Sequence, residues 1–326
     1  MINKPKITTM KFIKIMLIAC CISLTTQAQV IFQDAENGKY GLKDGNGQVI
    51  VEPKYNMLYE FSEGFSVVQL NQKWGYIDSK GKELTTLKYD DARDFSNGMA
   101  RVMIGNKWGY INKTGKEVIP FKYEWAGNFY DGLATIKLTG KYGCINNTGK
   151  VVIQTQYENE IEFTEGLAVA KHQGKFGFID MKGNIIIPIK YQVAKKFTFG
   201  LAPVGFNNKW GFLDKKGTVI IPFNYEAVFD KFTNGMNWAK IKMSGKWGAI
   251  DSTGKEVTEF KYDNANVFSE GLAAVQINKT WGYIDAGGKE VIPFIFERAG
   301  SFSMGKAEVK KDGKYFTIDK TGKAVE

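Results

Sequence analysis

Apolar and polar residues alternate over short runs along most of the chain, and glycine, asparagine and aspartate separate the runs. Residues 132–149, GLATIKLTGKYGCINNTG, are typical: one alternating run, the pair Thr139-Gly140, a second run, and then a turn-forming cluster. Short runs with a period of two predict β-strands, and the residues between them are those of tight turns. The pattern therefore predicts an all-β protein built from hairpins.

An aromatic residue followed by glycine marks an internal repeat. Nine aromatic residues keep this register, and the gaps between them are 34 five times, then 37, then 34 twice. A fixed spacing of this size indicates a modular array and replaces any estimate of domains from chain length. We predict nine units over residues 29–326, with three extra residues between the sixth and the seventh, at Tyr40, Trp74, Trp108, Tyr142, Phe176, Trp210, Trp247, Trp281 and Tyr315.

Each unit carries two turn signals. Aspartate or asparagine lies four residues after the marker and glycine seven after it, as at Asn112 and Gly115. The side chain can accept a backbone N–H two residues on, and glycine adopts a positive φ without a steric penalty. Just before each marker stands a pair such as Asn37-Gly38 or Thr139-Gly140, typical of a two-residue hairpin. One unit is therefore predicted to be a three-stranded antiparallel meander followed by a linker.

Rings and glycines account for the predicted core. The glycine after each marker leaves a bare patch of strand across which a ring can lie. A phenylalanine recurs in the linkers, twenty-one or twenty-two residues after the marker. One unit is too small to bury these rings by itself, so neighbouring units must stack. The phenylalanines are Phe61, Phe95, Phe129, Phe163, Phe197, Phe232, Phe268 and Phe302.

The residues that recur at fixed positions of the repeat together resemble those of a known family. The shared phrase K-W-G-Y-I-D-x-x-G-K-E-V-I-P-x-x-Y-x-x-A-x-x-F-S-x-G-L-A is similar to the WG (KWG) repeat of bacterial proteins, over residues 30–326. The chain departs from the phrase at Leu87, Thr280 and Tyr315-Phe316, and the last unit is the least typical. The resemblance implies a β-rich repeat array in secreted or envelope proteins, and it implies no activity.

The fold prediction is an open, twisted, solenoid-like array of meanders. Chain ends that fall at unit edges favour this form. The alternative is a closed, propeller-like ring, whose blades would have three strands instead of the usual four.

The first 28 residues differ from the array and predict a secretory signal peptide. Four lysines precede the apolar run IMLIACCISL, and small residues lead to a cleavage site after Ala28. The run is too short to span a bilayer, so no transmembrane segment is expected after cleavage. The alternative is a lipoprotein: Leu17-Ile18-Ala19-Cys20 resembles a lipobox that would leave Cys20 lipidated. Either reading predicts export to the periplasm or the cell exterior.

Cleavage of the signal peptide would change the net charge and the cysteine content of the protein. Removing residues 1–28 removes four lysines and no acids, so the formal charge falls from +10 to +6, and one cysteine, Cys144, remains. No intrachain disulfide is then expected. The marker lysines, such as Lys73 and Lys107, are spread one per unit among acids, and we interpret them as edge-strand residues that discourage aggregation. Dispersed charge does not favour a nucleic-acid partner.

No catalytic, cofactor or metal site is predicted. His172, the single histidine, stands beside a hairpin turn, and Cys144 occupies a column of buried rings. The Asp/Asn column lies among lysines, whereas a calcium loop needs several converging carboxylates. Asn112, Asn146 and Asn278 match the glycosylation pattern but are explained as turn residues. We therefore expect a protein that is not an enzyme.

Two tryptophans break the repeat pattern. Trp125 stands where other units have Met57, Asp91, Asn159 or Val193, and Trp238 lies in the 37-residue unit. Insertions in repeat arrays often map to a binding face. We predict that Trp125 and Trp238 contact a ligand or partner. The leading functional hypothesis is a scaffold for protein–protein interaction in the cell envelope, and the alternative is binding of carbohydrate or another envelope polymer through exposed rings.

Overall fold

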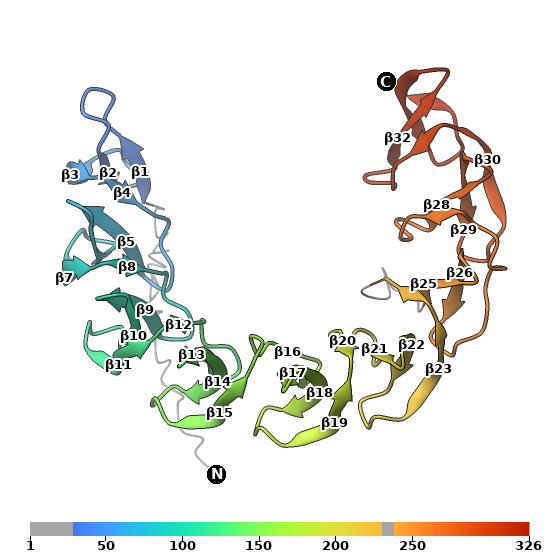
Figure 1. Cartoon of the computed structure of the whole chain (residues 1–326). Coiled ribbons are helices and arrows are strands. Elements are labelled where there is room, and N and C mark those ends of the chain that lie inside the picture. The colour runs from blue at the N-terminus through green and yellow to red at the C-terminus, as the bar shows by residue number, and fades with distance from the viewer. Residues whose placement is uncertain (1–28, 230–237, 326) are drawn as a thin grey trace, which may run out of the picture.

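The chain folds as a row of separate antiparallel sheets. The computed structural model describes residues 29–229 and 238–325, without the side chains of 238–243. Nine sheets are present in these residues, and no helix. They follow one another along an open, U-shaped arc, with β1 near one end and β32 near the other (Figure 1). The open array is thus confirmed over the closed ring. The predicted signal peptide and the inserted residues near 230–237 lie outside the described residues.

Seven of the nine sheets have four strands, so the prediction of three was too low. The second strands of the units are β1 (Val30–Gln33), β5 (Phe65–Leu70), β9 (Met99–Ile104), β13 (Leu133–Leu138), β17 (Leu167–His172), β21 (Ala202–Phe206), β25 (Trp238–Met243), β28 (Leu272–Ile277) and β32 (Lys306–Lys311). The third strands are β2 (Tyr40–Lys43), β6 (Lys73–Asp78), β10 (Lys107–Asn112), β14 (Lys141–Asn146), β18 (Lys175–Asp180), β22 (Lys209–Leu213), β26 (Lys246–Asp251), β29 (Thr280–Asp285) and β33 (Lys314–Asp319). The outer strands are β3 (Val49–Tyr55), β7 (Glu83–Tyr89), β11 (Glu117–Tyr123), β15 (Val151–Tyr157), β19 (Ile185–Tyr191), β23 (Val219–Tyr225), β30 (Glu290–Phe296) and β34 (Ala324–Val325).

The additional strand is a two-residue inner strand within the predicted linker. In the fourth sheet Trp125 and Ala126 pair with Lys137 and Ile136. Two residues are too few to give a periodic signal, which is why the sequence pattern does not show this strand. The inner strands are β4 (Met57–Leu58), β8 (Asp91–Ala92), β12 (Trp125–Ala126), β16 (Phe163–Thr164), β20 (Val193–Ala194), β24 (Ala227–Val228), β27 (Asn264–Ala265) and β31 (Arg298–Ala299).

The inner and outer strands define the two sides of the arc. In Figure 1, β4, β8, β12 and β20 lie on the concave side, and β3, β7, β11, β15 and β19 lie on the convex side. Each inner strand is hydrogen-bonded to one neighbour within its sheet, since the order is inner, second, third, outer. The concave side is therefore lined by a row of short strands and their connecting loops.

The turns form as their residue types predict. Thr139 and Gly140 have φ of 50° and 76°, the two positive values of a type I′ hairpin. The Asn146 side chain accepts the backbone N–H of Thr148 at 3.1 Å and that of Lys150 at 2.9 Å. The first unit is an exception: Asn37-Gly38 lies in the longer loop 34–39, where the Gly38 N–H donates to the Asp34 carbonyl at 2.9 Å.

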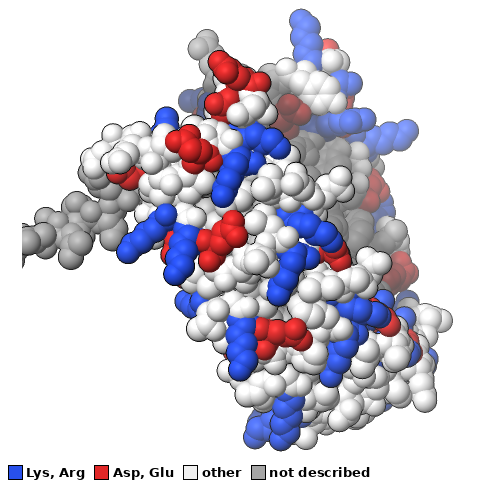
Figure 2. All heavy atoms as spheres, turned by 90° about the vertical axis from the view of Figure 1, so that its left-hand side faces the viewer, with Lys and Arg blue, Asp and Glu red and all other residues white. Residues whose placement is uncertain are grey.

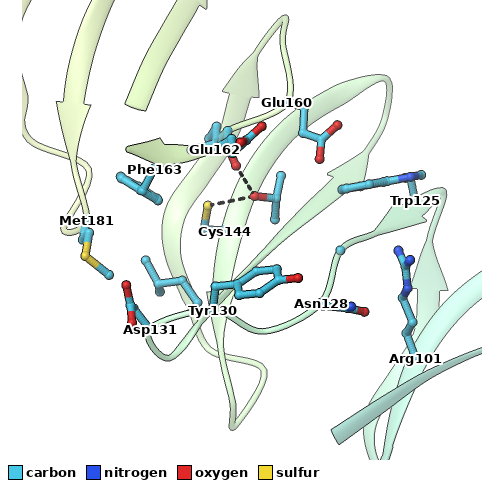
Figure 3. Close-up of a pocket in the computed structure, with 14 residues that line it drawn as sticks. Arg101, Trp125, Asn128, Tyr130, Asp131, Cys144, Glu160, Glu162, Phe163 and Met181 are labelled. Carbon is cyan, nitrogen blue, oxygen red and sulfur yellow. Dashed lines mark hydrogen bonds between the residues drawn. The ribbon is translucent and has the colours of Figure 1, made fainter. Parts of the chain in front are cut away.

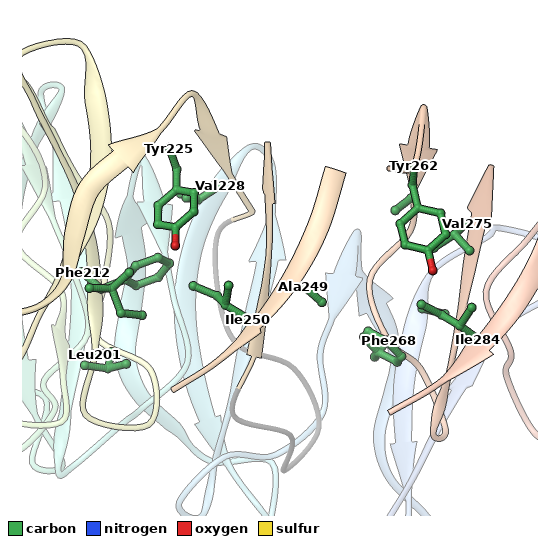
Figure 4. Packing of buried hydrophobic residues seen from close by; sticks show 13 residues of the cluster. Leu201, Phe212, Tyr225, Val228, Ala249, Ile250, Tyr262, Phe268, Val275 and Ile284 are labelled. Atoms are coloured by element: carbon green, nitrogen blue, oxygen red, sulfur yellow. The ribbon is translucent and has the colours of Figure 1, made fainter. Parts of the chain in front are cut away.

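The hydrophobic core lies between sheets, as the need for stacking predicts. Tyr110 and Ile119 of one sheet pack with Phe129 and Ile136 of the next. The largest cluster joins three sheets and includes Tyr225, Ile250 and Tyr262 (Figure 4). Most of the linker phenylalanines are buried, although Phe61 and Phe163 are half-buried and Phe232 lies outside the described residues. Each sheet thus provides half of two cores.

At Gly109 a ring lies across the gap left by the glycine, as predicted, but it belongs to the outer strand and is not the marker ring. The marker ring Trp108 is half-buried, and it does not fill the space beside its glycine. A Cβ built on Gly109 would lie 2.6 Å from the Ile119 carbonyl oxygen and 3.0 Å from the Phe121 ring of the outer strand. The register between β10 and β11 shifts at this point, which is a bulge. Glycine is required because the bulged outer strand approaches it closely.

The role given to the marker lysines is wrong for most of them. Lys73 begins β6, which lies between β5 and β7 and is therefore interior to its sheet. Its ammonium group is 2.6 Å from the Asp90 carboxylate in the connection to the next sheet. The marker lysines lie at hairpin ends, and of those within strands all but Lys246, which begins the edge strand β26, belong to interior strands.

Candidate binding cavity between two sheets

A cavity of about 610 Å³ opens between the fourth sheet, β12–β15, and the fifth, β16–β19. The fourth sheet supplies Trp125, Asn128, Tyr130 and Asp131, which lie on β12 and the loop that follows it. Figure 3 shows these side chains facing the segment that carries Glu160, Glu162 and Phe163, with Arg101 of the preceding sheet at one end. Aromatic, acidic, amide and guanidinium groups thus line one hollow.

A local change of sequence opens the cavity. At the second position of the inner strand most units have buried alanine, as at Ala126 and Ala194, whereas the fifth unit has an exposed glutamate, Glu160. The Asn159 amide accepts the Lys171 N–H at 2.6 Å and donates to the Val169 carbonyl at 2.9 Å. These side-chain bonds replace the usual backbone pairing of this unit's inner strand. Inner strand β16 consequently forms four residues later, at Phe163–Thr164.

A second change removes a connection between the sheets. At three other junctions a turn glutamate joins consecutive sheets: Glu63 accepts the Gly98 N–H at 2.9 Å and lies 3.1 Å from the Lys113 ammonium. We call this arrangement the glutamate staple, and it recurs with the same donors at Glu165 and Glu270. At the cavity the staple positions hold Asp131 and Met181, and both line the hollow. Methionine cannot form the ion pair.

Arg101 is the cationic group at the cavity. Its guanidinium donates to the Ala126 carbonyl and lies 5.6 Å from the Trp108 ring centroid. The Nε of Arg101 is buried without a hydrogen-bond partner among the described residues. Burial, and then the nearby charge of Arg93, lower the pKa of Arg101. The guanidinium remains charged at neutral pH, because arginine titrates far above it.

The predicted ligand residue Trp125 lines this cavity. Its ring is half-buried and meets Tyr142 edge to face, with 6.1 Å between centroids. Tyr130 is 68% exposed at the turn beyond it. Trp238 is the first residue of β25, in another sheet, and its side chain lies outside the described part of the chain. The structure therefore does not bring the two tryptophans into one sheet, and their role as ligand contacts stays a prediction.

Sequence reasoning overlooked Tyr130 and Glu160. Both depart from their columns: Tyr130 replaces the serine or threonine seen at Ser62 and Thr198, and Glu160 replaces alanine. The same comparison that selected Trp125 would have found them. That comparison has to start from the residues of the inner strand, and the sequence pattern does not show this strand.

Cys144, the candidate nucleophile, and His172, the single histidine, do not form a reactive centre. Cys144 is fully buried at the floor of the cavity, and burial raises the pKa of its thiol to about 11. The Thr135 hydroxyl lies 3.7 Å from its Sγ (Figure 3). His172 ends β17, with Nδ1 3.3 Å from the Gln156 carbonyl and its ring edge to face with Tyr157. No cluster of metal-ligating side chains occurs in residues 29–229 and 238–325.

A second hollow of about 560 Å³ adjoins the first at the next sheet. Glu160 and Glu162 line both. Lys196 of the sixth sheet forms an ion pair with Glu162. The two hollows are therefore neighbours that share these two acidic residues.

A family model described as "WG containing repeat" matches eight consecutive segments, which are residues 40–74, 74–108, 108–142, 142–176, 176–210, 210–247, 247–281 and 281–315. A search of curated proteins finds no match. Solved structures that match include the eukaryotic initiation factor, at 12% identity and a TM-score of 0.41, covering 92% of this chain and 95% of that one. BamB from Moraxella catarrhalis matches at 11% identity with a TM-score of 0.34, covering 81% of this chain and 97% of that one. AztD from Citrobacter koseri matches at 12% identity with a TM-score of 0.35, covering 91% of this chain and 93% of that one.

Proposed function

We propose that this chain, which belongs to the WG containing repeat family, is an exported, non-catalytic scaffold that binds a protein partner along the concave side of its arc. The family match spans residues 40–315, and the repeated sheets of the fold agree with it. A regular array is suited to this task, since stacked units give an extended surface that curves around a partner.

One observation carries the proposal: the varied residues and the repeated residues occupy different places. The repeated tyrosines, such as Tyr89 and Tyr123, are buried between sheets. The first position of the inner strand differs from unit to unit, and its side chains are half-buried or exposed; they are Met57, Asp91, Trp125, Val193, Ala227, Asn264 and Arg298, and the unpaired Asn159 holds the equivalent repeat position in the fifth unit. A constant frame that presents a varied row of side chains on one side is the arrangement a specific binding surface needs.

The charge distribution supports a protein partner more than a nucleic acid. Figure 2 shows lysines and acids interspersed over one face of the array. Several lysines of the array form ion pairs, as Lys113 does with Glu63 and Lys215 with Glu165. Nucleic-acid binding requires a continuous basic track along the phosphate backbone. Paired and dispersed charges do not form one.

Export is the second part of the proposal and rests on residues 1–28 and the family. The described residues contain no helix long and apolar enough to cross a bilayer. Cell fractionation with N-terminal sequencing tests the proposal: we expect an envelope or secreted protein beginning at Gln29. A blocked, lipid-modified Cys20 would select the lipoprotein alternative, and an intact N-terminus in the cytosol would contradict export.

The partner surface is tested by changing one side of the arc at a time. Met57→Asp with Arg298→Glu alters exposed residues of the inner strands, and Val118→Asp with Lys122→Glu is a matched change on an outer strand. The wild-type protein is used to capture partners from envelope extract, and each purified partner is then titrated against both variants. We expect the inner variant to bind at least about tenfold more weakly and the outer one to bind normally. Equal binding by both variants would overturn the proposal.

A further inference from the structure

We propose that the cavity between the fourth and fifth sheets is a carbohydrate-binding site, which takes an oligosaccharide with free hydroxyl groups. Its volume of about 610 Å³ lies within the usual range of small-molecule sites, roughly 300–1,000 Å³. It occurs at the junction where the glutamate staple is replaced by Asp131 and Met181. Asp131 and Met181, which stand at the staple positions of this junction, line the cavity together with Glu160.

The lining offers hydrogen-bonding groups that the protein itself does not use. The carboxylates of Asp131 and Glu160 have no hydrogen bond or ion pair with any described residue, and neither do the side chains of Asn128 and Tyr130. The Arg101 guanidinium also lines the cavity and supplies N–H donors, although its Nε is shielded from solvent. Acceptors and donors are thus free at the same place.

Two aromatic rings accompany these polar groups. In Figure 3, Tyr130 projects into the hollow. Trp125 lies next to Glu160, on the side of the hollow opposite Met181 (Figure 3). Tyrosine and tryptophan combine a flat apolar face with a polar tip. A sugar ring has the complementary form, since its C–H groups make an apolar face and its hydroxyls lie around the rim.

Other ligand classes fit the lining less well. A cationic side chain would pair with Asp131 and Glu160 but would also approach Arg101. An anion would pair with Arg101 but would meet Asp131, Glu160 and Glu162. An apolar ligand would leave all of these groups desolvated and unpaired. A sugar hydroxyl donates to a carboxylate and accepts from an amide or guanidinium, so it satisfies both kinds of group without a net charge.

The ligand is longer than one sugar ring. The neighbouring hollow of about 560 Å³ shares Glu160 and Glu162 with the first and continues toward the sixth sheet. A linear oligosaccharide can extend from one hollow to the next, whereas a monosaccharide fills only one.

The test begins with the full chain on an array of neutral, amino and uronic-acid oligosaccharides. The tightest oligosaccharide is then titrated by calorimetry and tryptophan fluorescence against three variants: Trp125→Asn, Tyr130→Ser and Glu160→Ala. Each introduces a residue that other repeats carry at that position, so the sheets should still form. Tyr315→Ala, which removes a ring 53% exposed in the last sheet, is the matched control.

We expect each cavity variant to lose at least about tenfold in affinity and the control to change less than about twofold. Far-UV circular dichroism and thermal melting check that the variants fold. Unchanged affinity in folded Tyr130→Ser and Glu160→Ala would overturn the proposal. It would also be overturned if no oligosaccharide bound while an oligolysine peptide did, since the carboxylates would then serve a cationic peptide.

Discussion

The third strand of every unit except the last, where Phe316 takes its place, carries a glycine directly after the marker. At Gly109 the outer strand bulges inward and brings a backbone carbonyl to 2.6 Å from where a Cβ would stand. The obstacle is backbone within a paired sheet, so it cannot rotate aside as a side chain would. The glycine of the WG pair is therefore a packing requirement, and the aromatic residue before it packs at the margin of the core.

Gly109→Ala tests this explanation. We expect a loss of about 1–3 kcal/mol in the free energy of unfolding, because added atoms force the strands apart. Urea unfolding followed by tryptophan fluorescence measures the change. Gly287→Ala is the control, since a Cβ there meets only the Asp285 side chain, at 3.4 Å. An effect at Gly109 no greater than at Gly287 would contradict the close-approach explanation.

Cys144 provides a second prediction for a single residue. Burial raises the pKa of its thiol to about 11, and the side chain is 0% exposed. At pH 8 the thiolate fraction is then roughly a hundredfold below that of an ordinary cysteine with a pKa near 8.5. In a variant with Cys20 and Cys21 replaced by serine, we expect reaction with a disulfide reagent to be at least that much slower in the folded than in the urea-unfolded state. Comparable rates in both states would show that the thiol is accessible.

Consecutive sheets are joined by contacts between their loops as well as by their cores. The glutamate staple combines a backbone N–H and a lysine from the next sheet on one carboxylate, as Gly305 and Lys320 do for Glu270. The hydrogen bond from Lys320, and then that from Gly305, lower the pKa of Glu270. The staple is exposed, so its contribution to stability is small and sensitive to salt.

The staple makes stability depend on pH in a defined direction. The pKa of Glu270 is lower in the folded than in the unfolded state, so its contribution is complete above the unfolded value of about 4.3 and is lost as the pH falls through the folded value. We expect Glu270→Gln to melt below the wild type at pH 7, with the difference disappearing under acid conditions.

Thermal melts at pH 3, 5 and 7 measure this difference. Glu290→Gln, which changes an exposed carboxylate with no ion pair among the described residues, is the control. A difference for Glu270→Gln that stayed constant from pH 7 to pH 3 would exclude the ionised staple as its cause.

The seventh sheet, β24–β26, lacks a continuous outer strand, although threonine alone is not the cause, since Thr85 holds the same repeat position within the complete strand β7. Thr258 stands where Ile119 lies in the third unit, and the Thr258 hydroxyl accepts the Ala249 N–H at 2.9 Å. This side-chain bond takes the place of a ladder bond. The segment that would form the outer strand makes only isolated bridges, Trp247 with Tyr262 and Ile250 with Glu256.

The whole molecule is held together by repetition of the same interface. Every cluster of buried residues includes side chains from at least two consecutive sheets, and one reaches across three. Contacts between the two ends of the arc are absent from the described residues, so the array has no ring closure to stabilise it. Stability in such an array is a sum over units and their nearest-neighbour interfaces.

A polypeptide of residues 124–157, which form the fourth sheet, is therefore expected not to fold. It would retain Ile136 and Ile145 but lose Tyr110 and Ile119, against which they pack. Circular dichroism should show no cooperative melt, whereas the full chain should melt cooperatively. A sharp melt of the short polypeptide would show that one sheet is stable by itself, contrary to this account.

Much of the architecture follows from the sequence alone, because the information is local and is repeated. A turn requires residues that tolerate a positive φ, as Gly149 does, or whose side chains bond nearby backbone, as that of Asn146 does. These residue types recur in all nine units, so the period can be identified from the sequence. Burial of the Tyr123 column follows from the same regularity, since rings that recur in every unit must be covered by the next.

Tertiary structure decided what depends on contacts between units. The two-residue inner strand has no pattern of its own and exists because the second strand offers it hydrogen bonds. The approach of Ile119 to Gly109 depends on a bulge, and the cavity depends on residues of two neighbouring sheets, such as Asp131 and Glu160, that line one hollow. The sequence determines the repeat period and the buried positions through local chemistry. The curvature of the arc and the location of the cavity follow from how neighbouring sheets of different sequence pack.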